Sequence, residues 1–211
     1  MKAGVITTSV YDDVMAQVRT KALKCSNEEM LVEIAKMYRN DYRTMQALLR
    51  NASITEAVQE EVAKSDVVHV RRILTQRGEH ISSVKVQNRL AFDKDWQVKL
   101  NLARTTNLEQ IKKLIFRNTP ENPANEHNEQ IRGVCLKRMS SLELIERFIL
   151  TNSNSLYRYG YYILSNQSLT TSLINMFVTL SPKLDETLVK MIREHPNYNE
   201  SVEETLNRYH K

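Results

Sequence analysis

Apolar residues recur along most of the chain at the spacing of an amphipathic helix. One stretch carries Val10, Val14, Val18 and Ala22, and later stretches repeat the pattern around Leu31, Val58 and other centres. Each stretch is only about three turns long, and helices of that length are marginal on their own in water. The pattern therefore predicts many short helices that are stable only when packed against one another.

The starts of several of these predicted helices are marked by Ser or Asn followed three residues later by an acid or amide, as in a capping box. Five pairs fit this description: Ser9 with Asp12, Ser26 with Glu29, Ser53 with Glu56, Asn107 with Gln110, and Ser140 with Glu143. Each pair opens an amphipathic stretch. We predict a helix after each of them.

A second kind of helix is predicted between these, and it carries a motif that begins with an apolar or aromatic residue followed by Arg or Lys. "VRRIL" at 70–74 and "VKLNL" at 98–102 are two examples. The predicted second helices cover 41–50, 66–77, 94–104, 126–138, 155–165 and, more weakly, 182–194. The basic residue recurs at intervals of 28, 28, 33 and 26, and a two-helix period near 28 is typical of an α-solenoid.

This pattern of a helix, a turn with Asp or Asn, and "VR" opening a second helix resembles HEAT-like and ARM-like repeats and the leucine-rich repeat variants. The resemblance covers residues 26–194 and implies an all-α, right-handed solenoid of about six short helical repeats in a single domain. Residues 1–25 and 195–211 are then expected to be terminal caps. In these families the Arg commonly pairs with the Asp in a ladder between adjacent repeats, and the best local candidate here is Asp66 with Arg71.

The interval of 33 is explained by a polar stretch, "RNTPENPANEHNEQ" at 117–130, which contains two prolines and little that can be buried. We predict a polar loop insertion at 118–130, within the fourth repeat. Such a loop is either a contact element or a tolerated surface excursion, and the sequence leaves both open.

Composition excludes several classes of protein. Only 4 Gly and 4 Pro occur in 211 residues, so the turns of β-sheet proteins and phosphate-binding loops have no sequence basis here. The fractions of 41% hydrophobic and 26% charged residues are those of a globular protein.

The sequence also bears on where the protein is found. No apolar run approaches the roughly 20 residues of a membrane span. The start, "MKAGVITTSVYDD", lacks the apolar core of a secretory signal. We expect a cytoplasmic protein without a membrane partner.

Candidate chemistry is sparse. Cys25 and Cys135 are far apart in the sequence and lack neighbouring ligands, so we expect buried thiols and neither a metal site nor a disulfide. The five histidines are isolated along the chain, and surface or capping roles suit them better than catalysis. We therefore predict no catalytic residues, no cofactor and no metal.

Basic residues of the second helices are the main candidates for binding a partner. They are Arg43, Arg71, Arg72, Lys99, Arg104, Arg132 and Arg158. If equivalent helices stack side by side, these residues form a basic stripe, which suits a row of acids or a phosphate backbone. The alternative is that the motif residues serve the internal Asp–Arg ladder. The net charge of +5 does not decide between the two.

The stretch "LYRYGYYIL" at 156–164 adds two aromatic candidates. On a helix, Gly160 shares the core face and permits close approach of a neighbour, while Tyr157 and Tyr161 lie on another face beside Arg158. Exposed Tyr next to Arg is typical of protein-binding hot spots and of platforms on which bases stack. Packing between repeats is the structural alternative.

These observations favour a non-catalytic scaffold that presents its second helices to a protein or peptide partner. The alternative is nucleic-acid binding through the basic stripe. A remote third hypothesis comes from resemblance to the HEAT-like alkylpurine DNA glycosylases, which hold a damaged base against Trp and Asp side chains. Here only Trp96, beside Asp95, offers such a pair, and that family uses more than one aromatic residue.

Overall fold

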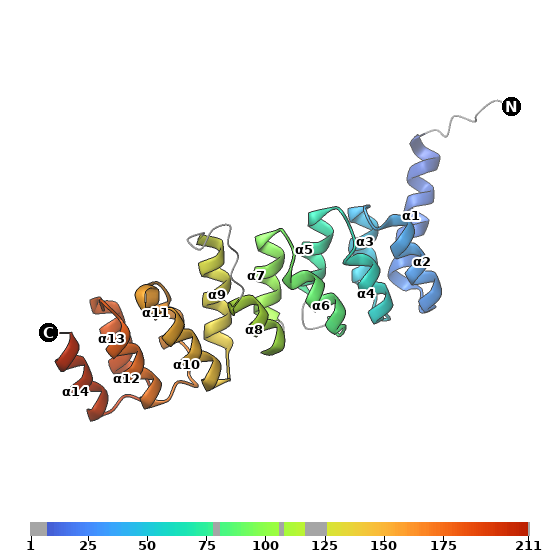
Figure 1. The fold of residues 1–211 in the computed structure, drawn as a ribbon. Coiled ribbons are helices and arrows are strands. Elements are labelled where there is room, and N and C mark those ends of the chain that lie inside the picture. Colours follow the sequence, from blue (N-terminus) through green and yellow to red (C-terminus); the bar gives the residue numbers. More distant parts are fainter. Residues whose placement is uncertain (1–7, 78–80, 106–107, 117–125, 211) are drawn as a thin grey trace. The chain divides into compact units, whose positions relative to one another are not determined.

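The computed structural model describes residues 8–77, 81–105, 108–116 and 126–210, and within these ranges the chain is all α-helical, without a β-strand (Figure 1). The helices are α1 (Thr8–Lys24), α2 (Glu28–Tyr38), α3 (Tyr42–Leu49), α4 (Glu56–Val62), α5 (Val68–Gln76), α6 (Val84–Ala91), α7 (Trp96–Thr105), α8 (Leu108–Phe116), α9 (Glu126–Arg138), α10 (Leu142–Thr151), α11 (Leu156–Leu164), α12 (Thr171–Leu180), α13 (Glu186–Glu194) and α14 (Glu200–Tyr209), with a short 3₁₀ turn at Ser153–Ser155.

The helices pack mostly on their second neighbours in sequence, within two compact units, Met1–Thr105 and Thr106–Lys211. In the first unit, α1, α3, α5 and α7 pack in succession, and α2, α4 and α6 form a second row. In the second unit, α9, α11 and α13 form one row, and α10, α12 and α14 form the other, while α8 packs on α9. Such alternation is consistent with a helical repeat array. We call α3, α5, α7, α9, α11 and α13 the second helices.

The predicted second helices are confirmed to within a few residues at each end, and α9 matches its prediction of 126–138. The predicted insertion at 118–130 is too long, because residues 126–130 belong to α9. Its remaining residues lie outside those that the structure describes.

Several helix starts differ from the predicted caps by one or two residues. Asn27 rather than Ser26 caps α2 through a hydrogen bond from Met30 N, and Ser141 rather than Ser140 caps α10. The helix α4 starts after Thr55, two residues beyond the predicted Ser53. In each case the residue next to the first helical residue has the extended backbone that a cap requires.

The observed caps of the first helices recur at a constant interval within each unit. In the first unit the N-caps Asn27, Thr55 and Ser83 recur at an interval of 28, which is also the interval of the basic motif there. In the second unit the N-caps Ser141, Thr170 and Asn199 recur at an interval of 29, whereas the motif residues of α9 and α11 are 26 apart.

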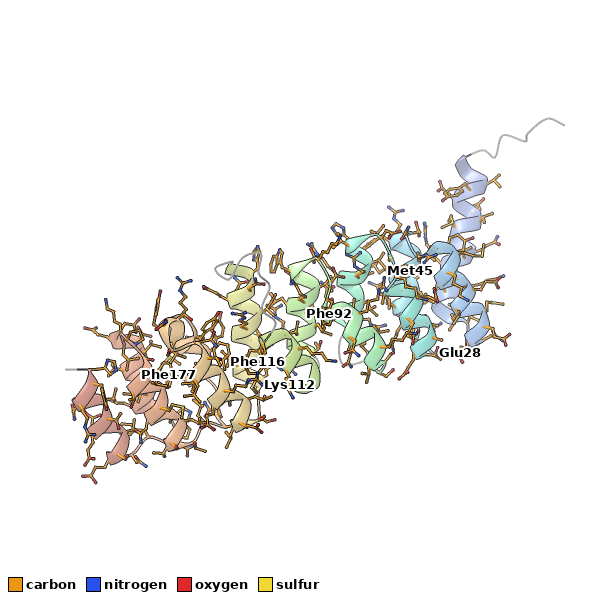
Figure 2. The ribbon with its side chains drawn as sticks, in the orientation of Figure 1. Glu28, Met45, Phe92, Lys112, Phe116 and Phe177 are labelled. Carbon is orange, nitrogen blue, oxygen red and sulfur yellow. The ribbon has the colours of Figure 1, made fainter. Side chains whose placement is uncertain are left out.

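Each unit buries the apolar faces of its helices between the two rows. Met45 in the first unit and Phe177 in the second are fully buried and are labelled in Figure 2. The start of α1 is different, because Val10, Tyr11 and Val14 are exposed although their spacing is that of an apolar face. None of the described helices is long and apolar enough to cross a membrane.

Candidate partner-binding site

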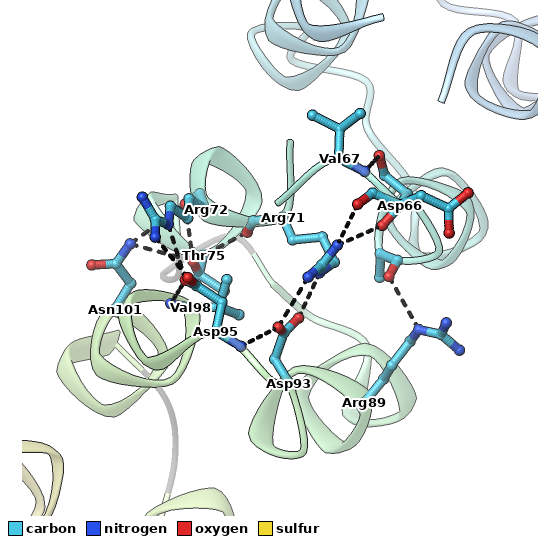
Figure 3. A network of polar contacts seen from close by, with 12 residues as sticks. Asp66, Val67, Arg71, Arg72, Thr75, Arg89, Asp93, Asp95, Val98 and Asn101 are labelled. Carbon is cyan, nitrogen blue, oxygen red and sulfur yellow. Dashed lines mark hydrogen bonds and ion pairs between the residues drawn. The ribbon is translucent and has the colours of Figure 1, made fainter. Parts of the chain in front are cut away.

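Arg71 is held inside the first unit by Asp93. Its Nε and Nη2 atoms donate to the two carboxylate oxygens of Asp93 at 2.6 and 3.1 Å, and the Asp93 side chain is only 6% exposed (Figure 3). The Nη1 atom donates to the main-chain carbonyls of Ser65 and Asp66. The predicted pairing of Arg71 with the Asp66 side chain is therefore wrong, because the carboxylate that pairs with Arg71 comes from the turn between α6 and α7.

Arg72 makes a parallel pair with the next acid of the same turn. Its Nε and Nη2 atoms donate to Asp95 at 2.9 and 2.6 Å, and Asp95 also caps α7 by accepting from Val98 N (Figure 3). The hydrogen bond from Arg72 lowers the pKa of Asp95 below its usual range, which keeps this carboxylate charged. These two arginines thus join α5 to the start of α7.

The basic residues of the second helices do not share one helical phase. Arg43 and Arg158 lie opposite the buried faces of α3 and α11, so both are on the exposed sides of their helices. Arg71 instead lies on the same side of α5 as the buried Val70 and Leu74, so it is at the edge of the core. The expectation of a single column that contains Arg43, Arg71 and Arg158 is therefore wrong for these three residues.

The other predicted basic residues differ in exposure. Arg104 near the end of α7 is exposed, whereas Lys99 and Arg132 are half-buried. Of the seven basic residues predicted to bind a partner, Arg43, Arg104 and Arg158 are exposed, and Arg71 and Arg72 pair with acids of their own unit.

The tyrosines of α11 are the predicted site residues that the structure brings together. Tyr157 and Tyr161 are 47% and 56% exposed, one turn apart. Arg158 lies between them in sequence, with its guanidinium carbon 5.7 Å from the centroid of the Tyr157 ring and its Nε donating to the Tyr157 hydroxyl at 3.0 Å. We call Tyr157, Arg158 and Tyr161 the α11 patch.

Two further contacts fix the α11 patch. Arg158 Nη1 donates to Glu129 Oε1 of α9 at 2.6 Å, and both side chains of this pair remain partly exposed. The Tyr161 ring meets the Tyr162 ring edge-on at 5.7 Å, and the Tyr162 ring lies against Gly133 of α9. The absence of a side chain at Gly133 lets α9 and α11 approach closely, so the helix that carries the patch packs tightly on α9.

A related arrangement occurs in the first unit. Tyr42 and Arg43 lie in the first turn of α3 as Tyr157 and Arg158 lie in the first turn of α11, and all four side chains are exposed. Eight residues after each of these arginines stands a buried asparagine. Asn51 Nδ2 donates to the carbonyls of Ala22 and Cys25, and Asn166 Nδ2 donates to those of Leu136 and Met139.

These asparagines were missed by reasoning from the sequence alone. Each closes the end of the preceding helix of its row, and its Oδ1 accepts from the main-chain N–H two residues later, at Ser53 or Ser168. The repeated spacing Arg-x₇-Asn-x-Ser at 43–53 and 158–168 is the signal that identifies them.

Potential metal ligands and nucleophiles were also predicted to have structural roles. The described residues contain no group of three or more His, Cys, Asp or Glu side chains placed to hold a metal ion. Burial raises the pKa of the Cys135 thiol to about 12, which makes it a poor nucleophile. Both ring nitrogens of the buried His195 have main-chain hydrogen-bond partners. Its Nε2 lies 3.2 Å from Asn166 O, and its Nδ1 accepts from Asn197 N.

Comparison of the chain with protein-family models, with curated proteins and with solved structures finds no match.

Proposed function

We propose that this protein is a non-catalytic scaffold of HEAT-like repeats, a right-handed α-solenoid that binds a protein or peptide partner on its second helices. The observation that carries the proposal is the α11 patch, in which two exposed tyrosines flank an arginine on a helix that packs closely on α9. Tyr and Arg dominate binding hot spots because they offer large contact areas and directional hydrogen bonds.

The charges of the second helices favour a protein partner over a nucleic acid. A phosphate backbone is followed by a continuous row of cations, and each contact adds to the salt dependence of binding. Arg71 and Arg72 are already paired with Asp93 and Asp95, and these pairs leave two fewer cations for such a row. The α11 patch has a single arginine, which suits binding to the side chains of a protein better than binding to a row of phosphates.

The proposal is tested by selecting peptides from a random display library on the immobilised full chain. One group of the peptides enriched on the wild type should lose at least about tenfold in affinity for the variant Tyr157→Ala/Tyr161→Ala, because truncating hot-spot aromatics costs more than about 1 kcal/mol each. Tyr209→Ala is the matched control, since Tyr209 is equally exposed on α14 in the other row. The proposal is refuted if no peptide is enriched, or if every enriched peptide binds the α11 variant as tightly as the wild type.

Nucleic-acid binding is the second candidate, because bases also stack on exposed tyrosines beside an arginine. Fluorescence anisotropy of labelled single- and double-stranded oligonucleotides at two salt concentrations separates the candidates. Binding that weakens steeply with salt would favour nucleic acid, and absence of binding at the lower salt would remove it. A glycosylase is opposed by Asp95, whose carboxylate is held by Arg72 and Val98 N.

A further inference from the structure

The first unit contains a hollow where the C-terminal ends of α3 and α5 lie near residues 51–54 and 81–82. Its volume is about 410 Å³, and a smaller hollow of about 220 Å³ adjoins it between α3 and α5. Leu49, Arg50 and Arg77 line both, so the two spaces meet at these residues. The larger one lies at the lower end of the volumes typical of ligand sites, roughly 300–1,000 Å³.

The buried part of the hollow's lining is apolar except at Asn51 and Gln59. Leu49, Leu74 and Ile81 are buried side chains that line it, and Ile54 contributes a half-buried one. Asn51 also lines the hollow, but its amide is held by the carbonyls of Ala22 and Cys25 and by Ser53 N. The Asn51 side chain is therefore held in place by its own unit.

The two arginines at the hollow differ from Arg71 and Arg72. Arg50 is exposed and Arg77 is half-buried, and no carboxylate within the described ranges forms an ion pair with either. Both occupy the C-cap of their helix, where the helix dipole favours a cation. This dipole accounts for an arginine at each helix end, but it leaves their guanidinium donors available beside an apolar hollow.

We propose that this hollow is a second binding site, which takes a peptide segment with an apolar side chain next to one or more carboxylates. The apolar side chain, of leucine or isoleucine size, occupies the space above Leu49 and Leu74. Arg50 and Arg77 then bind the adjacent carboxylates, since a guanidinium fork matches a carboxylate in shape and charge. The site lies in a different unit from the α11 patch, so it stands or fails independently of the proposed function.

The test uses an array of immobilised random octapeptides with blocked termini, probed with the full chain. Peptides with Asp or Glu next to Leu, Ile, Met or Phe should be enriched. Their binding to Arg50→Gln/Arg77→Gln should fall by about tenfold or more, because charge-assisted hydrogen bonds are lost. Tyr157→Ala/Tyr161→Ala should leave their binding unchanged, and this result separates the hollow from the α11 patch.

A second variant tests the apolar part of the site without altering its charge. Ala52 is exposed and lines the hollow, so Ala52→Trp should fill the space and remove binding of the same peptides while the fold is kept. The proposal is overturned if acidic–apolar peptides are not enriched. It is also overturned if these peptides bind Arg50→Gln/Arg77→Gln and Ala52→Trp as tightly as they bind the wild type. In that case the two arginines only stabilise the ends of their helices.

Discussion

Two glycines show how single residues set the distance between helices. A Cβ at Gly133 would lie 2.5 Å from ring carbons of Tyr162, whereas at Gly160 the nearest atom, 2.8 Å away, is a terminal methyl of Leu188. At Gly133 the nearest atoms belong to an aromatic ring, whereas at Gly160 they are the flexible end of a leucine side chain. The close approach at Gly160 was predicted from its position on the core face of 156–164, and that at Gly133 was not predicted.

We predict that Gly133→Ala is more destabilising than Gly160→Ala. Overpacking at Gly133 should cost about 1–3 kcal/mol of unfolding free energy, even though alanine favours a helix by about 1 kcal/mol over glycine. We expect a smaller effect at Gly160 because the end of the Leu188 side chain can shift to make room for the added methyl group. Urea unfolding measures the loss of unfolding free energy in each variant. Equal losses would contradict this prediction, because they would mean that the Tyr162 ring moves aside as easily as the end of Leu188.

Asp95 should make the first unit sensitive to acid. Its pKa in the folded protein is lowered by Arg72, so its stabilising contribution is complete above the ordinary aspartate value of about 3.9 and is lost as the pH falls below that value. The gap in unfolding free energy between wild type and Asp95→Asn should therefore be larger at pH 6 than near pH 2. A gap that is constant over this range would contradict the assigned pairing.

Between elements, the ion pair of Arg71 and Asp93 joins α5 to the turn before α7. Arg71→Gln leaves a carboxylate that is 6% exposed without its partner, and we expect a loss of about 2–4 kcal/mol. Arg43→Gln is the matched control, because Arg43 lies on the exposed side of α3 and its replacement should change stability by about 0.5 kcal/mol or less. Chemical denaturation measures both, and comparable losses would contradict the distinction drawn between these arginines.

Elements were more predictable from the sequence than the contacts between them. Amphipathic spacing located the second helices because each must bury one face, and cap positions were wrong by only a residue or two. The partner of Arg71 was wrong because Asp66 is close in sequence while Asp93 is brought near only by stacking of successive helices. The exposed start of α1 was missed for the same reason, since spacing does not reveal whether a neighbour covers an apolar face.

At the scale of the molecule, the candidate site was predicted in part. Tyr157, Arg158 and Tyr161 form one exposed patch, as their spacing on a helix suggested. The continuous basic stripe fails at Arg71 and Arg72, whose pairing with acids depends on the fold. The hollow beside Arg50 and Arg77 had no sequence signal, because its lining comes from separate helices and loops of the first unit.

The most direct test of the proposed binding role is photo-cross-linking in the cells that make the protein. A photoreactive phenylalanine analogue is placed at Tyr157 or Tyr161, and at Leu150 as a control, because Leu150 is equally exposed on α10 in the other row. We predict adducts at both tyrosine positions that protease removes and nuclease leaves intact, and few at Leu150. Adducts removed by nuclease, or adducts equally frequent at Leu150, would contradict a protein partner bound at the α11 patch.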